Sequence, residues 1–167
     1  MSVAEHKAAA PARVGVFVLT VSDTRTDATD SAGRAIRDLL TAEGHTVAGF
    51  RIVKDEPADV RATVEAALAE PAVQAVITTG GTGITSRDGT YEAVADLLQK
   101  RLDGFGELFR ALSYQEIGAA AMLSRAVAGT VGRKAVFVLP GSEHAVRLAV
   151  TKLILPELGH IRQQLAK

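Results

Sequence analysis

Apolar, β-branched runs alternate with amphipathic segments three times along the first part of the chain, and this alternation is the strongest constraint on its fold. The apolar runs lie at residues 13–23, 45–53 and 72–80, and the helical patterns at 30–44, 55–71 and 90–100. Strands that alternate with helices in this way form a mostly parallel sheet covered on both faces. We therefore expect a three-layer α/β/α sandwich with a Rossmann-like organisation.

The remainder of the chain continues the same layered pattern. Residues 105–126 predict one or two helices, residues 126–140 predict two short strands that meet near Gly132, and residues 142–165 predict a final helix that is broken or bent around Pro156. The segment 1–12 has little apolar surface, so a flexible tail is expected there. Residues 13–167 are expected to form a single domain.

Composition excludes several kinds of site. The 167 residues include nineteen basic and nineteen acidic side chains, so the overall charge does not indicate nucleic acid or an anionic membrane as a partner. The chain has no cysteine and its four histidines are scattered, which excludes thiolate catalysis and cysteine-based metal centres. No apolar run reaches the roughly 20 residues of a membrane span, and no signal-peptide pattern is present. A cytoplasmic location is therefore expected.

Polar residues follow each of the three predicted strands. Ser22 and Asp23 follow the first, Asp55 follows the second, and a glycine-rich turn that leads to Asp88 follows the third. The carboxyl ends of parallel strands lie at one edge of a sheet, so these groups are expected to converge on one rim. Mg²⁺ in proteins is held by one or two carboxylates, with water and substrate phosphates completing its coordination. The pattern therefore predicts a site for magnesium and phosphate.

The turn after the third strand reads TTGGTG, and its glycines admit two interpretations. Backbone N–H groups without neighbouring side chains can point at an anion, but the same glycines also suit a tight turn between a strand and a helix. The turn lacks the Lys-Ser/Thr pair of a P-loop, and Ser86 stands where a dinucleotide fingerprint has its third glycine. Arg87 suits either phosphate neutralisation or a solvent-facing position.

Five motifs occur in one order along the chain: TVSD, TTGGTG with SRD, FGELFR, LSRAVAG and LPGS. Together they resemble the MoaB/Mog family of molybdenum cofactor biosynthesis, and LSRAVAG is most similar to the MoaB branch. The resemblance implies an α/β/α fold, a homotrimer or hexamer, and binding of molybdopterin. Active members adenylylate molybdopterin with MgATP and release pyrophosphate, which implies Mg²⁺, ATP and molybdopterin as cofactor and substrates. Other proteins of the pathway are further candidate partners.

The resemblance also implies which residues form the site. Asp55 and Asp88 correspond to the catalytic, metal-binding aspartates of the family. The implied phosphate- and pterin-binding residues are Ser22, Asp23, Gly80, Gly81, Thr82, Gly83, Glu107, Ser124, Arg125, Gly141 and Ser142. The sequence departs from many relatives after LPGS, where Glu143 and His144 follow. Ser142 can therefore also be the cap of the last helix. A molybdopterin carrier without turnover is the alternative to an adenylyltransferase.

Overall fold

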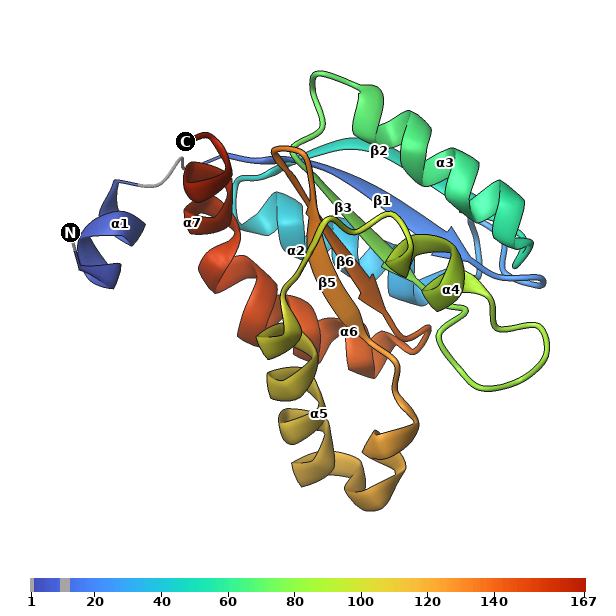
Figure 1. Ribbon diagram of the computed structural model, residues 1–167. Helices are drawn as coiled ribbons and strands as arrows, with labels where there is room; N and C mark the ends of the chain where they lie inside the picture. Colours follow the sequence, from blue (N-terminus) through green and yellow to red (C-terminus); the bar gives the residue numbers. More distant parts are fainter. Residues whose placement is uncertain (1, 10–12) are drawn as a thin grey trace.

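The computed structural model describes residues 2–9 and 13–167, which form a six-stranded sheet between layers of helices (Figure 1). The strands are β1 (Gly15–Val21), β2 (Thr46–Val53), β3 (Ala75–Thr79), β4 (Lys100–Arg101), β5 (Val127–Val131) and β6 (Lys134–Leu139). The helices are α1 (Val3–Ala8), α2 (Ser31–Ala42), α3 (Pro57–Ala69), α4 (Thr90–Ala95), α5 (Asp103–Ile117), the 3-10 helix η1 (Gly118–Leu123), α6 (Glu143–Ala149), the π-helical turn η2 (Val150–Ile154) and α7 (Leu155–Leu165). The predicted α/β/α sandwich is confirmed.

The strand order, β2-β1-β3-β6-β5-β4, creates a switch point at the centre of the sheet. β2, β1, β3 and β6 are parallel, whereas β5 is antiparallel to β6 and β4 is antiparallel to β5. From β1 the chain moves to β2 on one side, and it then crosses to β3 on the other side of β1. Loops that leave such a pair of strands diverge and open a crevice beyond their carboxyl ends. The ends of β1 and β3 are therefore the expected place for a ligand.

Side chains that alternate along β1 supply a core on each face of the sheet. Val16 and Val18 belong to the core that includes α2, α5, α6 and α7, whereas Leu19 and Val21 belong to the core under α3 and α4 (Figure 1). β3 is buried along its whole length. A strand covered on both faces is apolar at successive positions rather than at alternate ones. This burial explains why these strands were recognisable in the sequence as continuous apolar runs.

Helix α4 is shorter than the sequence pattern predicts. The helix expected to reach about Lys100 ends at Ala95, and Lys100–Arg101 forms the edge strand β4. The strand pairs with Gly129 and Thr130 of β5. Hydrogen bonds to β5 thus replace those that a longer helix would make. No local feature of the sequence signals this exchange, because the partner strand lies further along the chain.

The final helical segment is distorted before Pro156 rather than broken at it. The chain remains helical from Glu143 to Leu165, and Val150–Ile154 form the π-helical turn η2. Proline has no N–H, and its ring collides with the carbonyl four residues earlier, here that of Lys152. A π-turn widens a helix locally without ending it. The predicted break or bend is therefore a local widening between α6 and α7.

Part of the expected flexible tail has a helical structure. Val3–Ala8 forms α1, whose first turn is closed by a capping box between Ser2 and Glu5. α1 lies beside the C-terminal helix α7, where Lys7 forms an ion pair with Glu157 (Figure 1). None of the residues of α1 is buried, so polar contacts rather than an apolar face hold it there. Residue 1 and residues 10–12 of the predicted tail lie outside the described residues.

Candidate functional site

A cleft of about 500 Å³ opens beyond the carboxyl ends of β1, β3 and β6. Most of the residues that the family resemblance assigns to the site line this cleft: Ser22, Gly80, Gly81, Thr82, Gly83, Asp88, Ser124, Gly141 and Ser142. The remaining lining residues are Thr20, Val21, Arg25, Asp30, Thr79, Leu123 and Pro140. The cleft lies at the switch point between β1 and β3, as the topology of the sheet predicts.

The loop after β3 has a backbone conformation that requires glycine. Gly80 and Gly81 have φ angles of 98° and 72°, which side chains of L-residues rarely allow. A Cβ atom on Gly81 would lie 2.0 Å from the Thr90 hydroxyl and 2.7 Å from Oδ2 of Asp55. The loop therefore packs directly onto the start of α4 and onto the loop after β2. Glycine is needed at position 81 for both conformation and space.

The glycine-rich loop presents N–H groups that the protein itself does not use. Within the described part of the chain, the backbone N–H groups of Gly81, Thr82 and Gly83 donate no hydrogen bond, whereas the N–H of Gly80 donates to the carbonyl of Leu139 at 3.0 Å. All four residues line the cleft. Successive N–H groups in a turn form a concave site for an anion. Of the two sequence interpretations, the geometry therefore favours an anion-binding loop over a simple turn.

Asp55 lies behind this loop and is almost completely buried, with 6% of its surface exposed. Its Oδ1 accepts a hydrogen bond from the N–H of Gly89 at 3.2 Å, and its own N–H donates to Oδ1 of Asp23 at 3.0 Å. Burial raises the pKa of Asp55, and the negative charges of Asp88 and Asp23 raise it further. A nearby cation would stabilise the ionised form of a carboxylate in such surroundings. The structure thus brings the three predicted aspartates together, with Asp55 beneath the rim instead of on it.

Arg87 closes the outer side of this acidic group. Its Nε and Nη2 atoms each lie 3.1 Å from the carboxylate of Asp23, and Nη2 lies 2.9 Å from Oε1 of Glu56. The Arg87 guanidinium holds the pKa of Asp23 below its usual range. From the sequence, Arg87 was expected to be either a phosphate ligand or a solvent-facing residue. The structure shows a third arrangement, in which Arg87 is half exposed and bridges two loops.

Asp88 reaches the cleft from a turn that its own carboxylate stabilises. Oδ2 of Asp88 accepts hydrogen bonds from the N–H of Thr85 at 2.9 Å and from the Thr85 hydroxyl at 2.6 Å. The same carboxylate lies against Gly83, where a Cβ atom would come within 2.6 Å of Oδ2. Asp88 is therefore fixed beside the N–H groups of the glycine-rich loop. A ligand phosphate on the loop and a cation on Asp88 would be neighbours.

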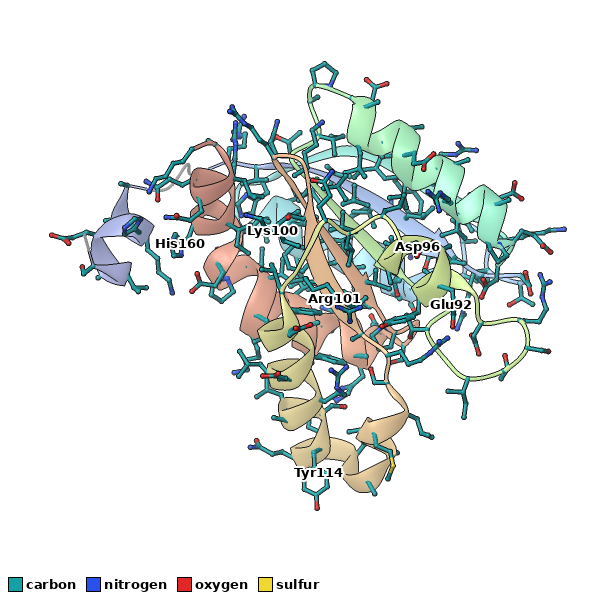
Figure 2. All side chains as sticks on the ribbon, viewed as in Figure 1. Glu92, Asp96, Lys100, Arg101, Tyr114 and His160 are labelled. Carbon is teal, nitrogen blue, oxygen red and sulfur yellow. The ribbon has the colours of Figure 1, made fainter. Side chains whose placement is uncertain are left out.

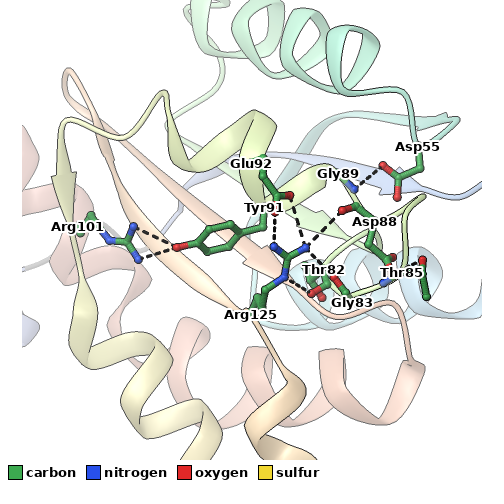
Figure 3. A network of polar contacts seen from close by, with 10 residues as sticks. All are labelled: Asp55, Thr82, Gly83, Thr85, Asp88, Gly89, Tyr91, Glu92, Arg101 and Arg125. Atoms are coloured by element: carbon green, nitrogen blue, oxygen red, sulfur yellow. Dashed lines mark hydrogen bonds and ion pairs between the residues drawn. The ribbon is translucent and has the colours of Figure 1, made fainter.

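Four of the assigned residues do not line the cleft: Asp23 and Asp55, described above, and Glu107 and Arg125. Glu107 is exposed on α5, and Arg125 lies behind the glycine-rich loop, where it donates to backbone carbonyl groups (Figure 3). Ser142 lines the cleft, and its hydroxyl caps α6 by accepting from the N–H of Ala145 at 3.2 Å. Its hydroxyl is thus already engaged in the helix cap.

The buried floor of the cleft was not predicted from the sequence. The hydroxyl of Thr20 donates to Oδ2 of Asp30 at 2.7 Å, and Oδ1 of Asp30 accepts from the N–H of Gly33 at 3.0 Å. Asp30 is 2% exposed. Asp30 is also the N-cap of α2. The positions of Thr20 and Asp30 in the sequence do not reveal the hydrogen bond between Asp30 and the end of β1.

The described residues limit what kinds of site are present. Over residues 2–9 and 13–167, no three histidine, aspartate or glutamate side chains come together as a metal cluster. Among the helices that the structure describes, none is both long and apolar enough to cross a membrane.

Comparison with known proteins agrees with this geometry. Residues 17–160 match the model of a family described as a probable molybdopterin binding domain. The chain belongs to this family. It is 55% identical over 166 residues to molybdenum cofactor biosynthesis protein B of Bacillus anthracis, with 99% of this chain and 98% of the relative covered. The corresponding protein of Bacillus subtilis is 50% identical, with 100% and 99% covered.

Solved structures confirm the family resemblance and the fold. A crystal structure of molybdenum cofactor biosynthesis protein B superposes with a TM-score of 0.91 at 54% identity, covering 94% of this chain and 98% of the other. The tungsten cofactor synthesizing protein MoaB from Pyrococcus furiosus superposes with a TM-score of 0.84 at 38% identity, covering 95% and 100%. This member of the molybdopterin-binding family therefore shares both sequence and architecture with MoaB proteins along nearly its whole length.

Proposed function

We propose that this chain acts in molybdenum cofactor biosynthesis by binding molybdopterin in the cleft and adenylylating it with MgATP. The observation that supports this most directly is the set of unused N–H groups at residues 81–83 beside the carboxylates of Asp55 and Asp88. The family supports a molybdopterin-binding domain, and the names of the relatives support the pathway. N–H groups that bind an anion, next to carboxylates that bind a cation, suit a reaction between two phosphate groups that is assisted by a cation.

The reaction joins two anions. An oxygen of the terminal phosphate of molybdopterin attacks the α-phosphorus of ATP, a P–O–P bond forms, the bond between the α- and β-phosphates breaks, and pyrophosphate leaves. A phosphate nucleophile is already ionised near neutral pH, so no strong general base is required. The task of the site is to position the phosphates and to stabilise the charge that they bring together.

The residues of the cleft can divide this task among them. The N–H groups of Gly81, Thr82 and Gly83 would hold one phosphate. Asp55 and Asp88 would hold Mg²⁺, and the fit rests on their positions, because the Asp55 carboxylate lies against Gly81 and the Asp88 carboxylate lies against Gly83 of the same loop. When bound, Mg²⁺ supplies neutralisation of the phosphate charges. The positive charge of Arg87 balances the negative charge of Asp23.

A molybdopterin carrier without turnover is the second candidate. It would use the same cradle, but it would have little need of two carboxylates beside the phosphate. The deciding experiment is to measure pyrophosphate release by the wild-type chain from MgATP in the presence and absence of molybdopterin. Release that depends on molybdopterin is expected. Tight binding of molybdopterin without any release would favour the carrier and contradict the transferase.

We also expect the chain to assemble into a trimer or hexamer. An exposed apolar patch covers α5 and η1, which extend away from the sheet (Figure 1), and it consists of Leu108, Tyr114, Ile117, Met122 and Leu123. Tyr114 points away from the rest of the molecule in Figure 2. Apolar patches of this kind mark surfaces that bind other proteins.

Light scattering is expected to give roughly three or six times the chain mass of 17.5 kDa. Ile117→Glu should shift the assembly toward smaller species, because it places a charge in the apolar patch. Val3→Glu is the matched control, since Val3 is also an exposed apolar residue but lies on α1, outside the patch. A wild-type monomer at all concentrations would contradict the expected assembly.

A further inference from the structure

We propose that Arg125 is a positioning residue that sets the direction of the N–H groups in the anion-binding loop. This inference rests on the proposed function, because it concerns how the same loop binds phosphate. The family resemblance assigned Arg125 to the edge of the ligand pocket. In the structure, Arg125 does not line the cleft, and its guanidinium instead contacts backbone carbonyl groups of the loop (Figure 3).

The Arg125 guanidinium donates hydrogen bonds to three carbonyl groups, which come from the two ends of the loop. Arg125 Nε donates to the carbonyl of Thr82 at 3.0 Å. Its Nη2 donates to the carbonyl of Gly83 at 2.6 Å and to that of Asp88 at 3.3 Å. The bonds therefore tie the first part of the loop to its last part, across the turn that carries Asp88. A charged donor strengthens each of these bonds relative to a neutral one.

The carbonyl directions determine where the next N–H groups point. In a planar trans peptide, the C=O of one residue and the N–H of the next point to opposite sides. With the Thr82 and Gly83 carbonyls held by Arg125, the N–H groups of Gly83 and Ile84 point away from it. The Asp88 carbonyl shows the same rule, because the N–H of Gly89 points the other way and donates to Oδ1 of Asp55 at 3.2 Å. One side chain thus orients the Gly83 N–H of the cradle and the Gly89 N–H that binds Asp55.

The charge of Arg125 is already balanced by the protein. Nη1 of Arg125 contacts the carboxylate of Glu92 on α4, and the Arg125 guanidinium holds the pKa of Glu92 below its usual range. The guanidinium also lies 5.1 Å from the centre of the Tyr91 ring, and the Tyr91 hydroxyl accepts from Arg101 at 3.3 Å. Arg125 is therefore fixed by α4 on one side and by the loop on the other. Its contribution is geometric, because its charge is neutralised locally.

Replacement by lysine separates geometry from charge. Lysine keeps the positive charge, but its single ammonium group cannot reproduce the flat fork that serves several acceptors at once. If Arg125 positions the loop, Arg125→Lys and Arg125→Met should both weaken binding of inorganic pyrophosphate by about tenfold or more. Isothermal titration calorimetry measures this directly. Arg61→Met is the control, because Arg61 lies in an exposed ion pair with Glu65 on α3.

Glu92→Gln provides a second test, in which the two explanations predict changes of opposite sign. Removal of the Glu92 charge loosens the anchor of Arg125, so positioning predicts weaker pyrophosphate binding. A direct role of the Arg125 charge predicts tighter binding, because a nearby negative charge is lost. Glu92 is exposed, so this variant tests the proposal even if Arg125→Met fails to fold. Unchanged or tighter binding in Glu92→Gln would overturn the proposal.

The backbone amide signals give a readout that does not depend on any ligand. In nuclear magnetic resonance spectra, the amide signals of Gly83, Ile84 and Gly89 should shift in Arg125→Lys, and the Gly89 amide should exchange faster with solvent. If the wild type fails to bind pyrophosphate, the proposed phosphate site is wrong, and these signals still decide the role of Arg125. Wild-type amide signals or wild-type pyrophosphate affinity in Arg125→Lys would contradict positioning while leaving the proposed function intact.

Discussion

Replacing Asp88 by asparagine is expected to slow pyrophosphate release by about 100- to 1000-fold, which corresponds to a barrier about 3 to 4 kcal/mol higher. Asparagine keeps the size of the side chain and an oxygen that can accept from Thr85, so the turn should persist. What it loses is the charge beside the glycine-rich loop. The fold should be retained, and molybdopterin affinity should change much less than turnover because the N–H cradle remains.

Asp55→Asn is expected to slow turnover to a similar extent for the same reason, but its effect on stability should differ. The charged form of Asp55 is disfavoured in the folded chain, since its pKa is raised by burial and by neighbouring carboxylates. A folded-state pKa above the unfolded value means that this residue stabilises the fold at low pH, and that this contribution is lost as the pH rises through the raised pKa. Asparagine does not titrate and can still accept from Gly89.

The pH dependence isolates this effect. In the presence of a chelator, the melting temperature of Asp55→Asn should equal or exceed that of the wild type at pH 7, and the difference should shrink as the pH falls toward the normal range for carboxyl groups. Asp96→Asn is the matched control for both aspartate variants, because Asp96 is an exposed residue at the end of α4 (Figure 2). Pyrophosphate release at the wild-type rate in both variants would remove the two aspartates from the mechanism.

Gly81→Val is expected to abolish anion binding and to destabilise the fold by about 3 kcal/mol or more. Gly81 has a φ of 72°, which valine cannot adopt without strain. The added Cβ atom would lie 2.0 Å from the Thr90 hydroxyl and 2.7 Å from Asp55 Oδ2, so both neighbours would have to move. The loop could not keep its N–H groups directed at a ligand after such a shift.

The effect of Gly81→Val is read from the thermal unfolding curve and from titration with sulfate or pyrophosphate. Gly104→Ala is the control for loss of a glycine, because a Cβ atom there meets no other atom within 4 Å and alanine favours a helix. The control should be neutral or slightly stabilising. A folded Gly81→Val variant with wild-type affinity for molybdopterin would show that the loop is only a turn.

Much of the site was predictable because its residues follow strands that are recognisable in the sequence. Ser22, Gly80 and Asp88 each come shortly after a continuous apolar run, and parallel strands bring such positions to one edge. The family resemblance then identified Gly141 and Ser124, which no local pattern connects to the others. The apolar runs and the family motifs are both properties of residue order, which can be read directly from the sequence.

The remaining features depend on contacts between distant segments, which no spacing reveals. The two-residue strand β4 depends on its pairing with β5, and the buried carboxylate of Asp55 lies against Gly81 and Gly89 from the loop after β3. Arg125 was expected among the ligand contacts, whereas its hydrogen bonds go to backbone carbonyls of the loop. A guanidinium suits both roles, so the sequence alone could not separate them.

The hydrogen bond from the Gly80 N–H to the Leu139 carbonyl links the glycine-rich loop to a segment made much later during synthesis. The hydroxyl of Thr79 makes a similar bond to the carbonyl of Pro140 at 2.7 Å. A nascent chain that ends before β6 therefore lacks the strand against which the loop is aligned. The cleft can take shape only after β6 has left the ribosome, so incomplete chains would not sequester the ligand.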